Sequence, residues 1–384
     1  MIHPVKINEL SQGVKRIIEQ DGPAPAKMMA ASGMAPLPPA ELITALYYLS
    51  YDGDNGISQK AQKTLLELPD NILLSTVSGD IFPEVLDGIV TFLVKREKVI
   101  EKIILNKRTP DETFIKLAET LKSEKLLEII IANEQRLLRT PVIIEKLYFN
   151  KYTRMSSVDR AVELAIRNHI ELTGIPAFDE AKKALEGELI FEADEEPTPD
   201  DLNFNNAVEH AEILAEAPVD EVNDVLDALE SGAADDNKSD IDENSEKKVV
   251  NLATSLTTMT VSQKIRMAML GSASQRSVLI RDSNKLVIMS VLKSPSVNDA
   301  EIRRYSSLKG LPEEAMRYIS CKRDWTKQYT VKLNLVNNPR TPIEYAIRFL
   351  NYLRPNDVRA LERSKDVPGV ISKAAKELRK KRTK

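Results

Sequence analysis

The stretch LVNNPRTPIEYAIRFLNYL, residues 335–353, decides the fold class of this chain. Its first part ends one helical pattern in a turn, and the next helix begins at Thr341 and Pro342. Thr341 is a predicted N-cap, Pro342 suits the first helical position, and Glu344 can reach back to the cap amide. Apolar residues then recur at helical spacing. The stretch therefore predicts two short helices joined by a tight turn.

Variants of this turn recur along the chain. The segment NKRTPDE at 106–112 has the same Thr-Pro start, and a further Thr-Pro pair begins at Thr140. The turns at 292–296 and 336–340 lie 44 residues apart. A basic residue followed by aspartate also recurs every 42 residues, and each aspartate is a predicted N-cap. These pairs are Arg281-Asp282, Arg323-Asp324 and Lys365-Asp366.

The recurring turns predict the architecture of the chain. A unit of about 30 to 44 residues cannot bury the apolar side of its own helices, whereas stacked units bury those sides against one another. The composition agrees, because aromatic residues, which favour strands, make up only 5% of the chain. The sequence therefore predicts an all-α fold, an α-solenoid of HEAT-like helical pairs.

Charge divides the chain into three segments. Residues 1–185 contain 24 basic and 25 acidic residues, residues 186–248 contain 3 basic and 22 acidic, and residues 249–384 contain 27 basic and 11 acidic. The middle segment has too few apolar residues to form its own core. We therefore expect two helical lobes joined by an acidic, largely disordered linker.

The predicted boundaries follow from these shifts in composition. Residues 1–39 are expected to form an N-terminal helix and a Pro/Ala-rich linker that is extended over 22–39. The other predicted segments are a neutral helical-repeat lobe at 40–185, the acidic linker at 186–250 with a short amphipathic helix near 219–230, and a basic helical-repeat lobe with a basic tail at 251–384.

Two sets of residues are predicted to bind partners. In the basic lobe, cations lie near aromatic residues and could bind acidic protein segments or, alternatively, nucleic acid. These cations are Arg303, Arg304, Arg317, Lys322, Arg323 and Lys327. In the linker, the helix near 219–230 carries an apolar stripe of Val222, Val225, Leu226 and Leu229. This segment is interpreted as a plain spacer, a pseudo-substrate that lies on the basic lobe, or a docking peptide.

The sequence predicts no catalytic, cofactor-binding or metal-ligating residues, and no cofactor. The three histidines are scattered, whereas a metal site needs clustered ligands. The segment from Asp52 to Gly56 resembles the start of a calcium loop, but Lys63 stands where such a loop needs a bidentate carboxylate. Cys321 has two basic neighbours, which would favour its thiolate. It is nevertheless interpreted as a small apolar residue that fills space in a helical repeat.

The cellular location is predicted from what the sequence lacks. With a single cysteine, Cys321, the chain cannot form an internal disulfide, which fits a reducing compartment. No apolar stretch of about 18 residues occurs, and the first twenty residues do not read as a signal peptide. We therefore expect a cytoplasmic protein that does not enter a membrane.

The chain also resembles a protein family. The stretch KIRMAMLGSASQRSVLIRDSNKLVIMSVLKSP at 264–295, together with 335–353, resembles a group of bacterial proteins with HEAT-like or leucine-rich-variant helical repeats. The resemblance covers residues 261–378 well and 39–172 loosely. It implies an α-solenoid from a bacterial cytoplasm. The group has no agreed activity, so the resemblance supplies no functional residues.

These observations together predict a non-enzymatic scaffold or adaptor that binds partner proteins on its helical surfaces. The first alternative is a nucleic-acid-binding protein that uses the basic lobe, and the second is an enzyme whose site the sequence does not reveal. Steep loss of binding with added salt would distinguish the first alternative. A deep pocket with convergent polar groups would indicate the second.

Overall fold

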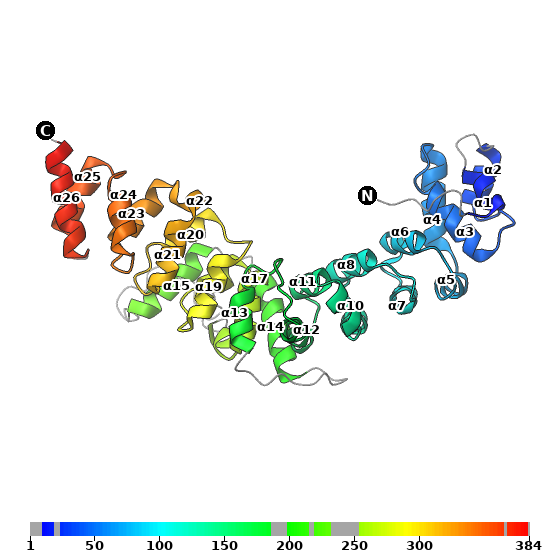
Figure 1. Cartoon of the computed structure of the whole chain (residues 1–384), viewed down its shortest axis with the longest axis horizontal. Coiled ribbons are helices and arrows are strands. Elements are labelled where there is room, and N and C mark those ends of the chain that lie inside the picture. Colours follow the sequence, from blue (N-terminus) through cyan, green and yellow to red (C-terminus); the bar gives the residue numbers. More distant parts are fainter. Residues whose placement is uncertain are drawn as a thin grey trace. The chain divides into compact units, whose positions relative to one another are not determined.

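The computed structural model of the chain (Figure 1) describes residues 10–18, 24–185, 198–214, 219–231, 253–364 and 367–382. Every regular element in these ranges is a helix, which confirms the all-α prediction. The chain divides into two compact units, Met1–Ile170 and Glu171–Lys384, called unit 1 and unit 2 below. None of the described helices has the length and the apolar character needed to cross a bilayer.

Unit 1 consists of short helices of 6 to 13 residues. Helices of this length are marginal alone and depend on packing. They are α1 (Gln12–Ile18), α2 (Ala24–Ala31), α3 (Pro39–Leu49), α4 (Asn55–Glu67), α5 (Asp70–Val77), α6 (Pro83–Leu93), α7 (Glu97–Leu105), α8 (Asp111–Thr120), α9 (Glu124–Ile131), α10 (Glu134–Arg139), α11 (Val142–Phe149) and α12 (Met155–Arg167).

The helices of unit 1 pack in two rows. In one row α5 contacts α7 and α7 contacts α9; in the other α6 contacts α8 and α8 contacts α11. Each helix buries an apolar stripe between its neighbours, as α9 does with Leu126, Leu127, Ile130 and Ile131. The sequence therefore places apolar residues at the spacing that this packing needs.

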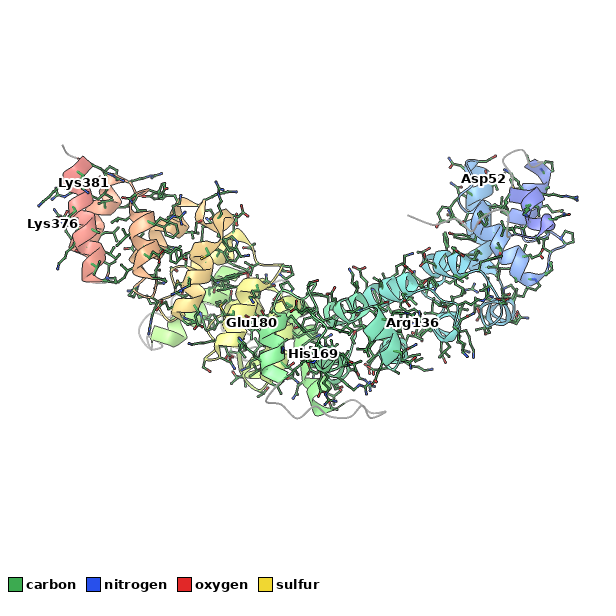
Figure 2. All side chains as sticks on the ribbon, in the orientation of Figure 1. Asp52, Arg136, His169, Glu180, Lys376 and Lys381 are labelled. Atoms are coloured by element: carbon green, nitrogen blue, oxygen red, sulfur yellow. The ribbon has the colours of Figure 1, made fainter. Side chains whose placement is uncertain are left out.

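Besides a short helical stretch at residues 253–257, unit 2 contains the helices from α13 onward. They are α13 (Phe178–Leu185), α14 (Pro199–Leu214), α15 (Val219–Ser231), α17 (Val261–Leu270), α18 (Ala273–Leu279), α19 (Lys285–Lys293), α20 (Asp299–Tyr305), α21 (Glu313–Cys321), α22 (Arg323–Thr326), α23 (Tyr329–Asn337), α24 (Ile343–Leu350), α25 (Pro355–Arg363) and α26 (Gly369–Arg382). Residues 376–382 of the predicted basic tail form the last part of α26, where Lys376 and Lys381 are labelled in Figure 2.

Packing in unit 2 again joins helices that lie close in the sequence. Helix α19 contacts α17, α18 and α21, α20 contacts α23, and α24 and α25 contact α26. Helix α13 packs against α17 and α19, and its Glu180, labelled in Figure 2, accepts a hydrogen bond from Lys293 at 2.8 Å. Helices α14 and α15 both contact α18.

A buried ion pair joins α18 to α20. The Arg276 guanidinium donates to the Glu301 carboxylate at 2.8 and 3.1 Å, and both side chains are almost completely buried. The carboxylate also accepts from the Tyr305 hydroxyl at 3.0 Å and from the backbone amide of Asn298, the N-cap of α20. Burial raises the pKa of the Tyr305 hydroxyl far above its usual value. Every oxygen of Glu301 therefore has a partner, as a buried carboxylate requires.

One asparagine contact occurs three times across the two units. The Asn106 side-chain amide donates to the carbonyls of Val77 and Gly79, at 2.7 and 3.1 Å. Asn150 and Asn338 make the equivalent pairs of bonds to the ends of α8 and α20. In each case an asparagine at the C-cap of one helix satisfies free carbonyls at the end of its neighbour in the same row.

We expect Asn150→Ala to lower the free energy of unfolding of unit 1 by about 1–3 kcal/mol, because it leaves two buried carbonyls without donors. Asn168→Ala is the matched control, since Asn168 is an exposed C-cap whose amide bonds only to its own helix. Urea unfolding followed by far-UV circular dichroism measures both. Equal effects of the two substitutions would show that the contact between helices adds no stability.

An aspartate at the start of α8 links it to the next helices. The Asp111 carboxylate accepts from Arg136, Arg139 and Thr140 at 2.6 to 2.9 Å. The hydrogen bonds from Arg139, with further help from Thr140 and Arg136, hold the pKa of Asp111 below its usual value. A lowered pKa in the folded state adds stability above the unfolded pKa, near 3.9 for aspartate, and this stability is lost as the pH falls through the folded pKa.

We expect Asp111→Asn to destabilise unit 1 by about 1 kcal/mol at pH 7, a small value because the site is partly exposed. The difference from the wild type should shrink as the pH falls below 4 and the wild-type carboxylate becomes protonated. Urea unfolding between pH 7 and pH 3 tests this, with Asp80→Asn as the control because Asp80 makes one exposed ion pair. A difference that stays constant over this pH range would contradict the prediction.

The structure differs from the sequence prediction near the N-terminus. Residues 24–31, predicted to be extended, form α2. Ala30 and Ala31 are fully buried, and the carbonyl of Ala31 accepts a hydrogen bond from Thr64 on α4 at 2.6 Å. Pro25 lies in the first turn of α2, where proline is tolerated, so the small residues behind it can pack closely on α4.

The acidic segment also differs from the prediction. The amphipathic helix near 219–230 is present as α15, but residues 199–214, predicted to be disordered, form α14. Phe204 and Ala207 are buried there and supply apolar contacts. The mostly acidic composition of the segment gave no sign of these contacts. Residues 186–197, 215–218 and 232–252 lie outside the described residues, so the prediction for them stays a prediction.

The predicted N-caps are mostly wrong. Asn284, not Asp282, caps α19, and Asp282 instead accepts from the Asn284 amide in the preceding turn. Asp324 lies inside α22, makes no cap hydrogen bond, and is exposed beside Lys327. Thr341 precedes the N-cap Pro342, whose side chain cannot cap. Because Asp324 makes one exposed ion pair, Asp324→Ala is expected to leave the urea unfolding midpoint unchanged. Lys365 and Asp366 lie outside the described residues.

Candidate partner-binding surface

The acidic helix α15 lies on the surface of α18 in unit 2. Its sequence VDEVNDVLDALES is helical because apolar residues recur three and four positions apart, on one side. Val222, Val225 and Leu226 are 1%, 2% and 7% exposed and pack with Val278 of α18 as one cluster. The predicted apolar stripe is therefore buried against the basic part of the chain. Leu229 is in α15, but its side chain is outside the described side chains.

Charge contacts continue this apolar cluster. The Asp227 carboxylate accepts from Arg281 and from Arg304, each at 2.6 Å, through its two different oxygens. Asp224 adds a longer contact to Arg304 at 3.9 Å. The arginines are mostly buried, whereas half of the Asp227 side chain is exposed to solvent. One aspartate of α15 thus joins two arginines that lie 23 residues apart, at the end of α18 and on α20.

Helix α14 makes a second contact with the same part of unit 2. Phe204 is fully buried, and the Arg266 guanidinium of α17 lies over its ring at 4.7 Å from the centroid. The buried Gln275 side chain of α18 donates to the carbonyl of Ala207 at 3.0 Å. Two helices from the acidic segment are therefore held by side chains of α17, α18 and α20.

The other cations predicted to bind partners do not gather at α15. Arg303 is exposed on α20, and Arg323 is exposed at the start of α22. Arg317 pairs with Glu313 at 3.1 Å, and Lys327 pairs with Asp324 at 2.6 Å. Lys322 lies over the Tyr318 ring, which packs edge-on against Trp325. Among the predicted cations, Arg304 alone contacts the described residues of α15.

Sequence reasoning missed Arg281 as a binding residue and treated it only as part of a repeat marker. The signal that could have found it is the aspartate at position 227, which comes directly after Leu226 of the apolar stripe. An acidic amphipathic helix with a carboxylate at the edge of its apolar side packs best on an apolar surface that has a cation beside it to pair with the carboxylate. Arg281 follows Val278 by three residues and therefore meets that requirement.

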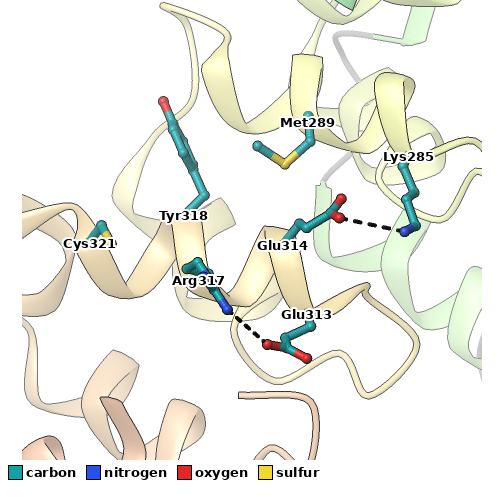
Figure 3. Close-up of a pocket in the computed structure, with 7 residues that line it drawn as sticks. All are labelled: Lys285, Met289, Glu313, Glu314, Arg317, Tyr318 and Cys321. Atoms are coloured by element: carbon teal, nitrogen blue, oxygen red, sulfur yellow. Dashed lines mark hydrogen bonds and ion pairs between the residues drawn. The ribbon is translucent and has the colours of Figure 1, made fainter. Parts of the chain in front are cut away.

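A cavity lies between α19 and α21 (Figure 3). Its volume is about 600 Å³, and it is lined by Lys285, Met289, Glu313, Glu314, Arg317, Tyr318 and Cys321. The charged groups pair with one another, Lys285 with Glu314 at 3.7 Å and Arg317 with Glu313. These side chains are more than half exposed, so the cavity offers solvated ion pairs and no desolvated acid or base.

Cys321 lies at the edge of this cavity. Its Sγ is 3.2 Å from the Tyr345 Oη, and this hydrogen bond raises the pKa of the tyrosine hydroxyl. Within the described ranges, no three His, Cys, Asp or Glu side chains gather so that they could hold a metal ion.

Comparison with known proteins adds no argument about function. The sequence matches no protein-family model and no curated protein. A crystal structure of an engineered protein aligns over 96% of this chain and 97% of its own, with 13% sequence identity and a TM-score of 0.17. A similarity this low supports neither a fold nor a function.

Proposed function

We propose that the chain is a non-enzymatic scaffold or adaptor of a bacterial cytoplasm that binds partner proteins on its helical surfaces. In this proposal the packed rows form an α-solenoid of HEAT-like pairs in two lobes, and unit 2 prefers acidic segments. Helices that contact their second neighbours in chain order support the solenoid. The charges support the preference, because basic residues exceed acidic ones by 16 over 249–384.

The position of α15 carries this proposal. Within unit 2, the acidic amphipathic helix α15 packs on its neighbours by the two means that scaffolds use for partner segments, apolar burial and charge pairing. Unit 2 therefore has a surface whose chemistry is suited to acidic helices. The exposed cations Arg303, Arg317 and Arg323 extend the same positive charge over α20–α22.

Affinity capture from cell extract tests the scaffold. We expect the full chain to retain partner proteins, and R303E/R317E/R323E to lose most of them. The matched control is K60E/K95E/K98E, which reverses three exposed lysines of unit 1. Both triple variants must keep the wild-type circular dichroism spectrum. Retention that is equal in the two variants would contradict the role of unit 2.

The second candidate is nucleic-acid binding, which the exposed cations beside Tyr318 and Trp325 favour. The same capture separates the two functions when the extract is treated with nuclease. Proteins bound directly should be retained after the treatment. If nuclease removes them all, and the purified chain binds a labelled 25-nucleotide strand with a steep salt dependence, the chain is a nucleic-acid-binding protein instead.

A further inference from the structure

We propose that the surface formed by α18 and α20 is a docking site for an acidic amphipathic helix of a partner protein, and that α15 occupies it in the free chain. This inference rests on the proposed function, because it names the class of segment that the scaffold binds. The fitting helix has apolar residues at the positions of Val222, Val225 and Leu226, and a carboxylate at the position of Asp227.

Helix α15 fills the site incompletely. A cavity of about 300 Å³ remains beside Leu226, and Leu256, Thr257, Val278, Leu279, Arg281 and Asp282 line the rest of it. Leucine leaves this space open, whereas a phenylalanine at the same position can extend into it. A partner helix with a larger apolar residue there would therefore bury more surface than α15 does.

Helix α15 also satisfies the hydrogen-bond donors of Arg304 only in part. Its Nη2 donates to Asp227, but its Nε is buried and has no hydrogen-bond partner among the described residues. An arginine binds a carboxylate best through two parallel hydrogen bonds. A partner helix with glutamate at the position of Asp227 has the extra reach to engage both nitrogens.

Helix α15 belongs to the same chain as the site that it occupies. A helix tethered beside its site binds at a high effective concentration, so contacts that would be weak between separate molecules are enough. A free partner must make better contacts to displace it, and the cavity and the Arg304 Nε are where such contacts are available. The site is thus occupied by α15 until a better-fitting helix arrives.

The test uses the full chain and a fluorescein-labelled peptide with the sequence of residues 219–231, measured by fluorescence anisotropy. In the chain, V222D/V225D releases α15 by placing two charges in its apolar cluster. L202D/N203D is the matched control, because it adds the same two charges at exposed positions of α14. We expect V222D/V225D to bind the peptide at least tenfold more tightly than the wild type or the control does.

Changes in the peptide test the contacts without altering the fold of the chain. A peptide with Leu226→Phe should bind V222D/V225D at least threefold more tightly than the unchanged peptide, and one with Asp227→Glu should also bind more tightly. A peptide with Asp227→Lys should bind at least tenfold more weakly, and R281E in the chain should restore part of its binding. Circular dichroism confirms that each chain variant is folded.

Several results would overturn the inference. These are no binding by V222D/V225D of either the unchanged peptide or the Leu226→Phe peptide, equal binding by the wild type, or no effect of Asp227→Lys in the peptide. Dimers of the wild type that V222D/V225D abolishes would show that the occupant is a second copy of the chain. Binding of a 25-nucleotide strand, but not of the peptide, would show that the site takes nucleic acid. If peptide binding fails while partner capture persists, the docking site is wrong and the scaffold function stands. If the peptide binds but the full chain captures no partner proteins, the docking site stands and the scaffold function is wrong.

Discussion

Replacing Glu301 by glutamine is expected to lower the free energy of unfolding of unit 2 by about 3–5 kcal/mol. The substitution keeps the shape of the side chain and its hydrogen bond to the N-cap amide of α20. It removes the charge that balances the buried Arg276, whose remaining partners are the carbonyls of Gly271 and Ser296. A buried cation without a counterion is costly, because water no longer solvates it.

Trp325 provides the measurement for this prediction. It is the single tryptophan of the sequence and lies in unit 2, so its fluorescence during urea unfolding reports on that unit. Glu313→Gln is the control, because Glu313 makes an exposed pair with Arg317 and should matter by less than about 0.5 kcal/mol. Similar midpoints for the two variants would show that burial of the Arg276–Glu301 pair has no energetic importance.

We expect Gly88→Ala to destabilise unit 1 by about 1–3 kcal/mol through overpacking. Gly88 is buried on α6, and a Cβ at this position would overlap the ring of Tyr47 on α3. The ring cannot move aside easily, because Tyr47 is buried and packs edge-on against Tyr48 and Tyr51, with centroids 5.6 Å apart. Burial also raises the pKa of the Tyr47 hydroxyl to about 12.

The expected loss opposes a gain, since alanine favours a helix over glycine by about 1 kcal/mol. Gly53→Ala is the control, because a Cβ there meets no atom within 4 Å. Far-UV circular dichroism should show earlier unfolding for Gly88→Ala, while Trp325 fluorescence stays unchanged. The double variant G88A/Y47L should recover part of the loss. A stabilising effect of Gly88→Ala alone would mean that α3 and α6 are not in close contact at this point.

Helical periodicity predicted the helices well and their ends poorly. The stripes of α9 and α15 could be read from the sequence, because burial on one side requires apolar residues three and four positions apart. The caps could not, because aspartate, asparagine and threonine also form turns just before a helix. Asp282 illustrates this, since it accepts from the amide of Asn284, and Asn284 is the residue that caps α19.

The partner of α15 was beyond what local sequence could predict. Asp227 contacts Arg281 and Arg304, which lie 54 and 77 residues further along the chain. Arginines of the same kind, such as Arg303 and Arg317, are exposed at other positions of unit 2. Composition therefore indicated that basic residues could receive an acidic helix, but only the three-dimensional arrangement distinguishes the two that do.

The separation between α15 and its arginines also has a consequence during synthesis. In unit 1, hydrogen bonds between side chains of neighbouring helices join residues about 24 to 30 positions apart, so each helix can dock soon after it leaves the ribosome. Asp227 is translated 77 residues before Arg304. At a synthesis rate of roughly 5–20 residues per second, about 4–15 s pass between the synthesis of Asp227 and that of Arg304. During that interval the newly made helix is open to capture by any other cationic surface nearby.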